Sequence, residues 1–108
     1  MSSQQFDCDE EAERIVQHAA KSHTTRFQED FPMSTAVAEI ADDSLEKNEL
    51  LMLLEDDADD AIGRAFANHP ADDAQRLRID DDEFQTAKTL GDLKAIIAER
   101  MRAITALL

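Results

Sequence analysis

The chain has 108 residues, of which 25 are acidic and 11 basic, giving a formal net charge of −14 at pH 7. A charge of this size repels nucleic-acid phosphates and anionic membrane surfaces, so it argues against a nucleic-acid-binding protein. Hydrophobic residues make up 43% of the chain, with only two Gly and two Pro, which favours a folded all-α protein over a disordered one. We expect a flexible N-terminal leader at residues 1–8 and a single helical domain at residues 9–108, monomeric in solution.

The expected location is cytoplasmic. The single cysteine, Cys8, has no partner for an internal disulfide, and we expect it to have no role. The polar N-terminal residues have no apolar signal core, and no stretch approaches the length of a membrane span, so stable membrane insertion is not expected.

The first predicted helix runs from Asp9 to about Ser22. Its apolar residues recur at helical spacing: Ala12, Ile15, Val16, Ala19 and Ala20. Residues 23–42 then form a long connection, because Pro32 prevents a continuous helix. A loop of this length needs buried anchors, and the apolar residues available for that role are Phe27, Phe31, Val37 and Ile40.

The second predicted helix begins at Asp43 or Ser44. One broad apolar stripe marks it: Leu50, Leu51, Leu54, Ala58, Ala61, Ile62, Ala65 and Phe66. Gly63 is a candidate end or bend, and Asn68-His69-Pro70 is expected to stop the helix before a polar loop at residues 69–76. The sequence leaves open whether residues 59–76 are helix or loop.

The last part of the chain predicts one short and one long helix. Leu77-Arg78-Ile79 alternates apolar and basic residues, and a short helix is expected around Glu83 to Ala87. Thr89 and Asp92 form a capping-box pattern at the start of the final helix. Its stripe is Leu90, Leu93, Ile97, Met101, Ile104 and Leu108. Three long helices and one short helix, with a long loop between the first two long ones, predict a small helical bundle.

Ser44 is the residue most suited to a function, because it lies where the long loop turns into a helix. A hydroxyl there is exposed, and an anionic phosphodiester attached to it would be stabilised by the free backbone N–H groups and the helix dipole. A serine or aspartate at such a place is more often simply the N-cap. From Asp42 to Asp60 the chain has nine acidic residues and one basic residue, Lys47. This acidic stretch is either a solvated face or a docking surface for basic partners.

Two blocks of sequence, in matching order, resemble acyl carrier proteins. The segment from Ile40 to Glu55 contains Asp43-Ser44-Leu45 and resembles the prosthetic-group region of that family. Further along, Leu77-Arg78-Ile79 and Thr89-Leu90-Gly91-Asp92-Leu93 resemble the family motifs that precede its third helix and open its fourth. The resemblance implies an acyl-carrier-like four-helix bundle without enzyme activity of its own.

The same resemblance implies a phosphopantetheine arm esterified to Ser44 by a phosphopantetheinyl transferase, with Asp43 and Leu45 beside it. The thiol of the arm would carry acyl groups as thioesters and present them to acyl-transferring or acyl-modifying enzymes with basic docking patches, in a fatty acid, lipid or polyketide pathway. The residues implied in contacts with these partners are Asp42, Glu46, Lys47 and Glu49.

Several departures from the family pattern indicate a specialised carrier. Ala41 stands where the family has Gly, and Lys47-Asn48 changes the face that partners touch. The main alternative is therefore an acidic, carrier-like interaction module without a prosthetic group. A peptidyl carrier is disfavoured, because such carriers usually have His or Gly where this chain has Asp43.

Other groupings of reactive residues are weak. The histidines His18, His23 and His69 are scattered, and neither His18 nor Cys8 has neighbours with metal-ligand spacing, so no metal site is expected. The acids from Asp80 to Glu83 lack the glycine and the alternating ligands of an EF-hand loop. Ser44 has no nearby histidine that would make it a hydrolase nucleophile.

Overall fold

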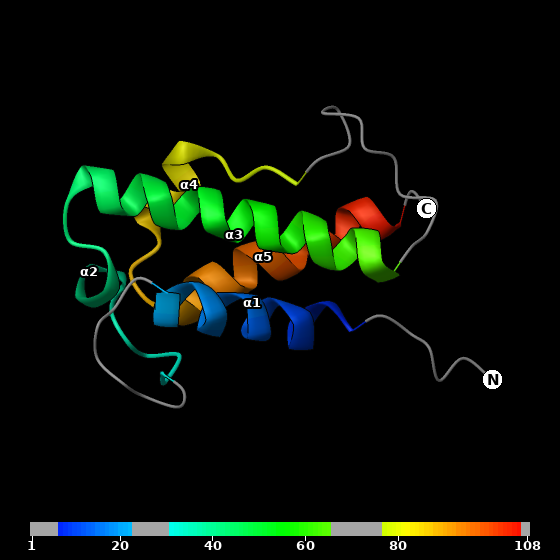
Figure 1. Ribbon diagram of the computed structural model, residues 1–108, viewed down its shortest axis with the longest axis horizontal. Helices are drawn as coiled ribbons and strands as arrows, with labels where there is room; N and C mark the ends of the chain where they lie inside the picture. Colours follow the sequence, from blue (N-terminus) through cyan, green and yellow to red (C-terminus); the bar gives the residue numbers. More distant parts are fainter. Residues whose placement is uncertain (1–6, 23–30, 66–76, 107–108) are drawn as a thin grey trace.

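The structure of the protein is a computed structural model, and it describes residues 7–22, 31–65 and 77–106. These residues form five α-helices and no strand beyond an isolated bridge (Figure 1): α1 Cys8–Ser22, α2 Val37–Ile40, α3 Ser44–Ala65, α4 Asp81–Thr86 and α5 Leu90–Thr105. The three long helices pack on one another, with α1 against both α3 and α5. The all-α class predicted from composition is confirmed. No helix in the described ranges combines the length and the apolarity needed to cross a membrane.

The predicted stripes form the core. Ile15 of α1, Leu54 of α3 and Ile97 of α5 are completely buried and belong to one apolar cluster. The other described side chains of each stripe are buried with them, except that Ile104 is half-buried. Three stripe members have side chains outside the described part of the chain: Ala65, Phe66 and Leu108. Helical periodicity therefore identified the packing faces of all three long helices.

The first helix begins one residue earlier than the sequence suggests. Asp7 caps it, since its Oδ1 accepts a hydrogen bond from the Glu10 N–H at 3.1 Å and its carbonyl accepts one from the Glu11 N–H at 3.0 Å. Cys8 is consequently the first helical residue and is buried near the end of α5, where burial raises the pKa of its thiol. Cys8 thus has a packing role, and its thiol is poorly nucleophilic.

The connection between α1 and α3 is anchored as expected but contains a helix that the sequence did not predict. Phe31, Val37 and Ile40 are buried, which confirms three of the four predicted anchors, while Phe27 lies outside the described residues. Val37–Ile40 forms the single turn α2. A four-residue helix is too short to show helical periodicity, so its two buried residues looked only like loop anchors.

The segment before α2 pairs with the start of α5. The N–H of Val37 donates to the carbonyl of Lys88 at 2.9 Å, and the N–H of Leu90 donates to the carbonyl of Thr35 at 2.9 Å. Gly91 follows, with its N–H bonded to the carbonyl of Met33 at 2.8 Å. A Cβ on Gly91 would lie 3.2 Å from that carbonyl oxygen, so the glycine allows the two segments to approach closely.

Helix α3 continues through Gly63 to Ala65, so the glycine neither ends nor breaks it. Two of its carboxylates hold the extended segment that leads into α4. Glu55 Oε2 accepts the Ile79 N–H at 2.8 Å, and Asp59 Oδ1 accepts the Leu77 N–H at 2.9 Å. The side chains of Leu77 and Ile79 are buried and that of Arg78 is exposed, which agrees with the alternation of apolar and basic residues in this segment.

The short helix α4 is held against α5 by Arg100. Its guanidinium bonds to the Glu83 carboxylate, and its Nε donates to the Arg78 carbonyl at 3.3 Å. The predicted capping box at α5 is present: the Asp92 N–H donates to Thr89 Oγ1 at 3.2 Å, and the Thr89 N–H donates back to Asp92 Oδ2 at 3.2 Å. The sequence patterns of both C-terminal helices are therefore realised locally.

Candidate functional site

The start of α3 is capped by Asp43 and not by Ser44. Asp43 Oδ1 accepts the N–H of Glu46 at 2.8 Å, and the Asp43 carbonyl accepts the first helical hydrogen bond from Lys47 at 3.0 Å. Glu46 returns the interaction, since its Oε1 accepts from the N–H of Asp42 at 3.0 Å and from that of Asp43 at 3.4 Å. These bonds form a reciprocal box in which Asp43 takes the place usually held by Ser or Thr.

Ser44 is therefore the first helical residue, with its side chain exposed. Its hydroxyl has no hydrogen-bond partner among the residues described. Asp43 already makes the capping hydrogen bond, so Ser44 is not needed as the helix cap. The hydroxyl lies beside the first-turn N–H groups of a long helix, where a negatively charged group is favoured. The side chain is thus open to modification without breaking any contact that holds the fold.

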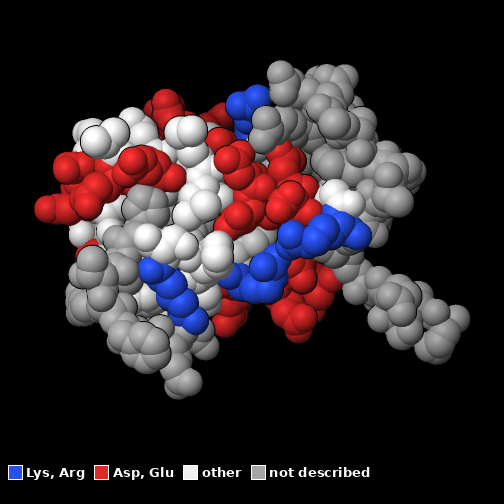
Figure 2. Space-filling model, in the orientation of Figure 1, with Lys and Arg blue, Asp and Glu red and all other residues white. Residues whose placement is uncertain are grey.

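The predicted partner residues, together with Asp43, divide into exposed ones and ones with an intramolecular role. Asp42, Asp43 and Glu49 are exposed, while Lys47 and Glu46 are half-buried. Glu46 has an intramolecular role in the cap, which was not predicted from the sequence. Figure 2, in the orientation of Figure 1, shows acidic side chains gathered over the beginning of α3. This end of α3 combines strong negative charge with an accessible hydroxyl.

Two large apolar side chains lie exposed on α3. Leu45 is 69% exposed and Met52 is 62% exposed, and they are seven residues apart, so they lie on the same side of the helix two turns from each other. Exposed Glu49 is between them along the chain. An exposed apolar pair within an acidic surface has the composition of a protein contact site, because the apolar groups gain from burial and the carboxylates select basic partners.

Leu45 was predicted to matter as a neighbour of Ser44, whereas Met52 was not predicted to have a role. The signal was present, since Met52 falls outside the buried stripe formed by Leu50, Leu51 and Leu54. A methionine on the solvent side of a helix is an apolar side chain that lies outside the core. Its spacing of seven residues from Leu45 can be read from the sequence alone.

A pocket of about 240 Å³ opens beside this end of α3, between α2, α3 and α4. Buried Val37 and Phe84 contribute apolar surface. The residues that line it in the described ranges are Val37, Ala38, Lys47, Phe84, Gln85, Ala87 and Lys88. Lys47 is one helical turn beyond Ser44, so the pocket lies toward the end of α3 that carries the hydroxyl. The sequence contains no signal for this pocket, because its walls come from three separate elements.

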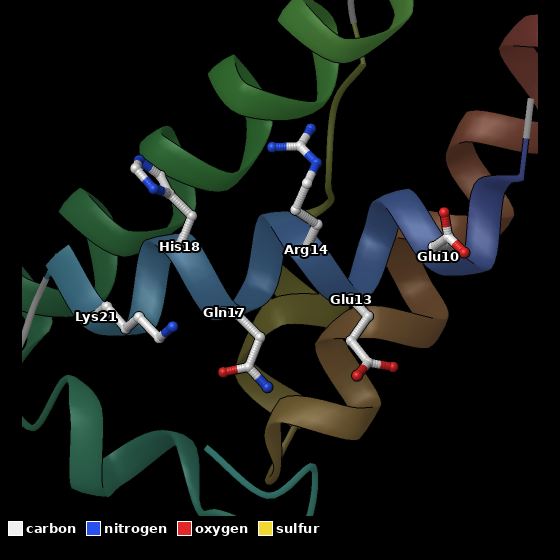
Figure 3. Close-up of a pocket in the computed structure, with 6 residues that line it drawn as sticks. All are labelled: Glu10, Glu13, Arg14, Gln17, His18 and Lys21. Carbon is white, nitrogen blue, oxygen red and sulfur yellow. The ribbon is translucent and has the colours of Figure 1, made fainter. Parts of the chain in front are cut away.

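A larger hollow, of about 610 Å³, lies along α1 (Figure 3). Its side chains do not converge: Arg14 and His18 point toward α3, whereas Glu13, Gln17 and Lys21 lie on the other side of the helix. They also have internal partners, since Arg14 bonds to Glu11 at 2.7 Å and His18 Nε2 lies 3.8 Å from Asp57 Oδ2. Lacking convergent polar groups, this hollow does not have the character of a reaction site.

The described residues contain no group of three or more His, Cys, Asp or Glu side chains arranged to hold a metal ion. Burial raises the pKa of Asp57, and the nearby His18 partly lowers it again. Because Asp57 lies at the contact of α1 and α3 and not in a pocket, this shift reflects packing.

No protein-family model matches the chain, and the searches of curated proteins and of solved structures find no match either.

Proposed function

We propose that the protein is an acyl carrier of a specialised fatty acid, lipid or polyketide pathway, with a phosphopantetheine arm on Ser44. A separate phosphopantetheinyl transferase esterifies the Ser44 hydroxyl, and the thiol of the arm then holds acyl groups as thioesters. The protein performs no reaction on them; it presents them to enzymes with basic docking patches.

The observation that carries the proposal is the division of roles between Asp43 and Ser44. Asp43 makes the capping hydrogen bond, at 2.8 Å to the Glu46 N–H, which leaves the Ser44 hydroxyl exposed at the first turn. A serine needed only as a cap would use its own oxygen for this bond. A phosphodiester on Ser44 would be stabilised by the α3 dipole, against repulsion from Asp42 and Asp43.

The arrangement of helices supports a carrier-type bundle. In this interpretation α1, α3 and α5 are the three long helices, α4 is the short one, and α2 is an added turn in the long loop between α1 and α3. The segment Thr89-Leu90-Gly91-Asp92-Leu93, which resembles the family motif, also stabilises the fold of this chain. Thr89 and Asp92 cap α5, and Gly91 allows the Met33 carbonyl to approach closely.

The exposed side of α3 is the proposed docking surface, consisting of Leu45, Glu49 and Met52. The apolar pair would supply the buried centre of a contact and the carboxylates its charged rim. This surface is next to Ser44, so an enzyme bound there would receive the thiol of the arm directly.

The test is incubation of the protein with coenzyme A and several phosphopantetheinyl transferases, followed by intact-mass measurement. The expected result is a gain of about 340 Da, the mass of one phosphopantetheine, that is lost in Ser44→Ala. Two variants of Asp43 separate its role in capping α3 from the role of its charge in recognition by the transferase. Asp43→Asn keeps a good N-cap and removes the charge, whereas Asp43→Ala removes both. A folded protein that gains no mass with any transferase would overturn the proposal.

The second candidate is an acidic interaction module without a prosthetic group. The exposed pair Leu45 and Met52 favours it, since such a surface serves protein binding whether or not Ser44 is modified. The two candidates differ in one result: the module predicts no gain of mass, together with partner binding that is unchanged in Ser44→Ala and weakened in Met52→Gln.

A further inference from the structure

Most basic side chains in the described ranges are paired, as expected for a protein with 25 acidic residues. Each of five cations lies within 3.3 Å of a carboxylate: Arg14, Arg64, Lys94, Arg100 and Arg102. Lys21 also has an interaction within the structure. Lys47, Lys88 and Arg78 form no ion pair with any carboxylate of the described ranges. In a chain of this charge, lysines that form no ion pair within the described ranges need a reason.

Lys47 and Lys88 line the same pocket, whereas Arg78 does not. They reach it from different elements, Lys47 from α3 and Lys88 from the link between α4 and α5. The apolar part of the pocket comes from Val37 and Phe84, both almost completely buried, and from half-buried Ala87. A pocket with mixed polar and apolar walls, lined by two lysines that form no ion pair within the described ranges, suits a ligand with an apolar body and an anionic end.

We propose that this pocket receives the free end of the acyl cargo and selects chains that end in a carboxylate. The inference rests on the proposed function, because the arm on Ser44, one turn before Lys47, delivers the cargo. A volume of about 240 Å³ is below the roughly 300–1,000 Å³ of ordinary small-molecule pockets, which favours a small ligand. The preferred cargo is therefore a short dicarboxylic chain, with its methylenes against Phe84 and Val37 and its carboxylate between the two lysines.

The direct test compares the protein carrying a six-carbon carboxylate-ended chain, adipyl, with the protein carrying the neutral six-carbon chain, hexanoyl. Both are loaded from their coenzyme A thioesters, and cleavage by hydroxylamine is measured relative to the free coenzyme A thioester. The expected result is that adipyl is cleaved about two- to fivefold more slowly than hexanoyl, the range for one partly solvated ion pair. Amide NMR signals of Val37, Phe84 and Ala87 should shift more with adipyl than with hexanoyl.

Variants tie the preference to the lysines. Lys47→Gln and Lys88→Gln should each reduce the difference between the two cargoes, whereas Arg78→Gln should leave it unchanged, since Arg78 is a cation outside the pocket that likewise forms no ion pair within the described ranges. Equal protection of the two chains, or a preference that survives in the Lys47→Gln, Lys88→Gln double variant, would overturn the inference. The latter result would assign the lysines to the phosphodiester of the arm or to docking.

A second measurement keeps the inference separate from the proposed function. The unmodified protein is titrated with monomethyl adipate and with methyl hexanoate while the same amide signals are followed. If the signals shift at lower concentrations of monomethyl adipate than of methyl hexanoate, and if Lys88→Gln weakens this preference, the pocket binds anionic ligands even if Ser44 accepts no arm. No preference in this titration, together with equal cleavage of loaded cargo, refutes the pocket while leaving modification of Ser44 intact.

Discussion

Gln17 of α1 holds the backbone of Phe31 with two hydrogen bonds. Its Nε2 donates to the Phe31 carbonyl at 2.7 Å, and its Oε1 accepts the Phe31 N–H at 2.8 Å. Both residues are buried, so the amide satisfies two backbone groups that water cannot reach. This pair fixes the point where the long connection returns to the core, before α2 and the start of α3.

Replacing Gln17 by Met should therefore destabilise the protein although the volume is nearly preserved. The Phe31 N–H and carbonyl would remain buried without partners, and we expect a loss of about 1–3 kcal/mol in the free energy of unfolding. Urea denaturation followed by circular dichroism measures the loss. The control Glu10→Met changes an exposed residue of the same helix and should stay within about 0.5 kcal/mol. Equal effects of the two substitutions would refute the role assigned to Gln17.

The two glycines should respond to alanine with opposite signs. Gly63 is exposed inside α3, and no atom lies within 4 Å of the place that a Cβ would occupy, so Gly63→Ala should stabilise by about 0.5–1 kcal/mol through helix propensity. Gly91→Ala would place its Cβ 3.2 Å from the Met33 carbonyl oxygen and should destabilise by about 1–3 kcal/mol. Thermal unfolding of both variants measures this difference, and a stabilised Gly91→Ala would show that the close approach does not constrain the fold.

The α5 cap makes stability depend on pH in the acid range. Backbone hydrogen bonds from Lys88 and Thr89 lower the pKa of Asp92 in the folded state. Its contribution to stability is therefore fully present above the ordinary Asp value of about 3.9 and is lost as the pH falls through the lower folded pKa. The difference in stability between the wild type and Asp92→Asn should shrink over this interval in urea titrations at several pH values. A difference that is constant with pH would contradict the assigned cause.

Docking on α3 should depend on both apolar contact and charge. Met52→Gln and Leu45→Gln should lower kcat/KM of a phosphopantetheinyl transferase about fivefold or more without lowering the melting temperature, because both side chains are exposed. Glu49→Lys should also lower it, and raised salt should weaken the wild-type reaction. Glu10→Lys makes the same charge change on α1 and serves as the control. If it has the same effect as Glu49→Lys, then net charge and not the surface of α3 determines docking.

The sequence predicts the parts of this structure that depend on local patterns. The stripes containing Ile15, Leu54 and Ile97 are apolar at helical spacing, and the Thr89–Asp92 box is a contiguous motif, so each element could be assigned without knowledge of its neighbours. The exposed Ser44 also follows from its place between loop and helix. What could not be predicted was that Asp43, and not Ser44, makes the cap, because both residue types cap helices equally well.

The remaining features arise from contacts between distant segments. Gln17 looks like an ordinary polar residue of a surface helix, and only the return of Phe31 buries it. Glu55 and Asp59 look like part of a solvated acidic face, yet they accept backbone N–H groups from Ile79 and Leu77. The pocket with Lys47 and Lys88 likewise exists only after three elements meet. Such tertiary roles leave no periodic trace in the sequence.

The most direct test of the central claim is to locate the modification after transferase treatment by peptide mass spectrometry. The proposal predicts that the gain of about 340 Da falls on the peptide containing Ser44, and that Ser34, which is also exposed, stays unmodified. Complete absence of the modification from the Ser44 peptide, in protein whose circular dichroism shows the folded helical state, would contradict the carrier function.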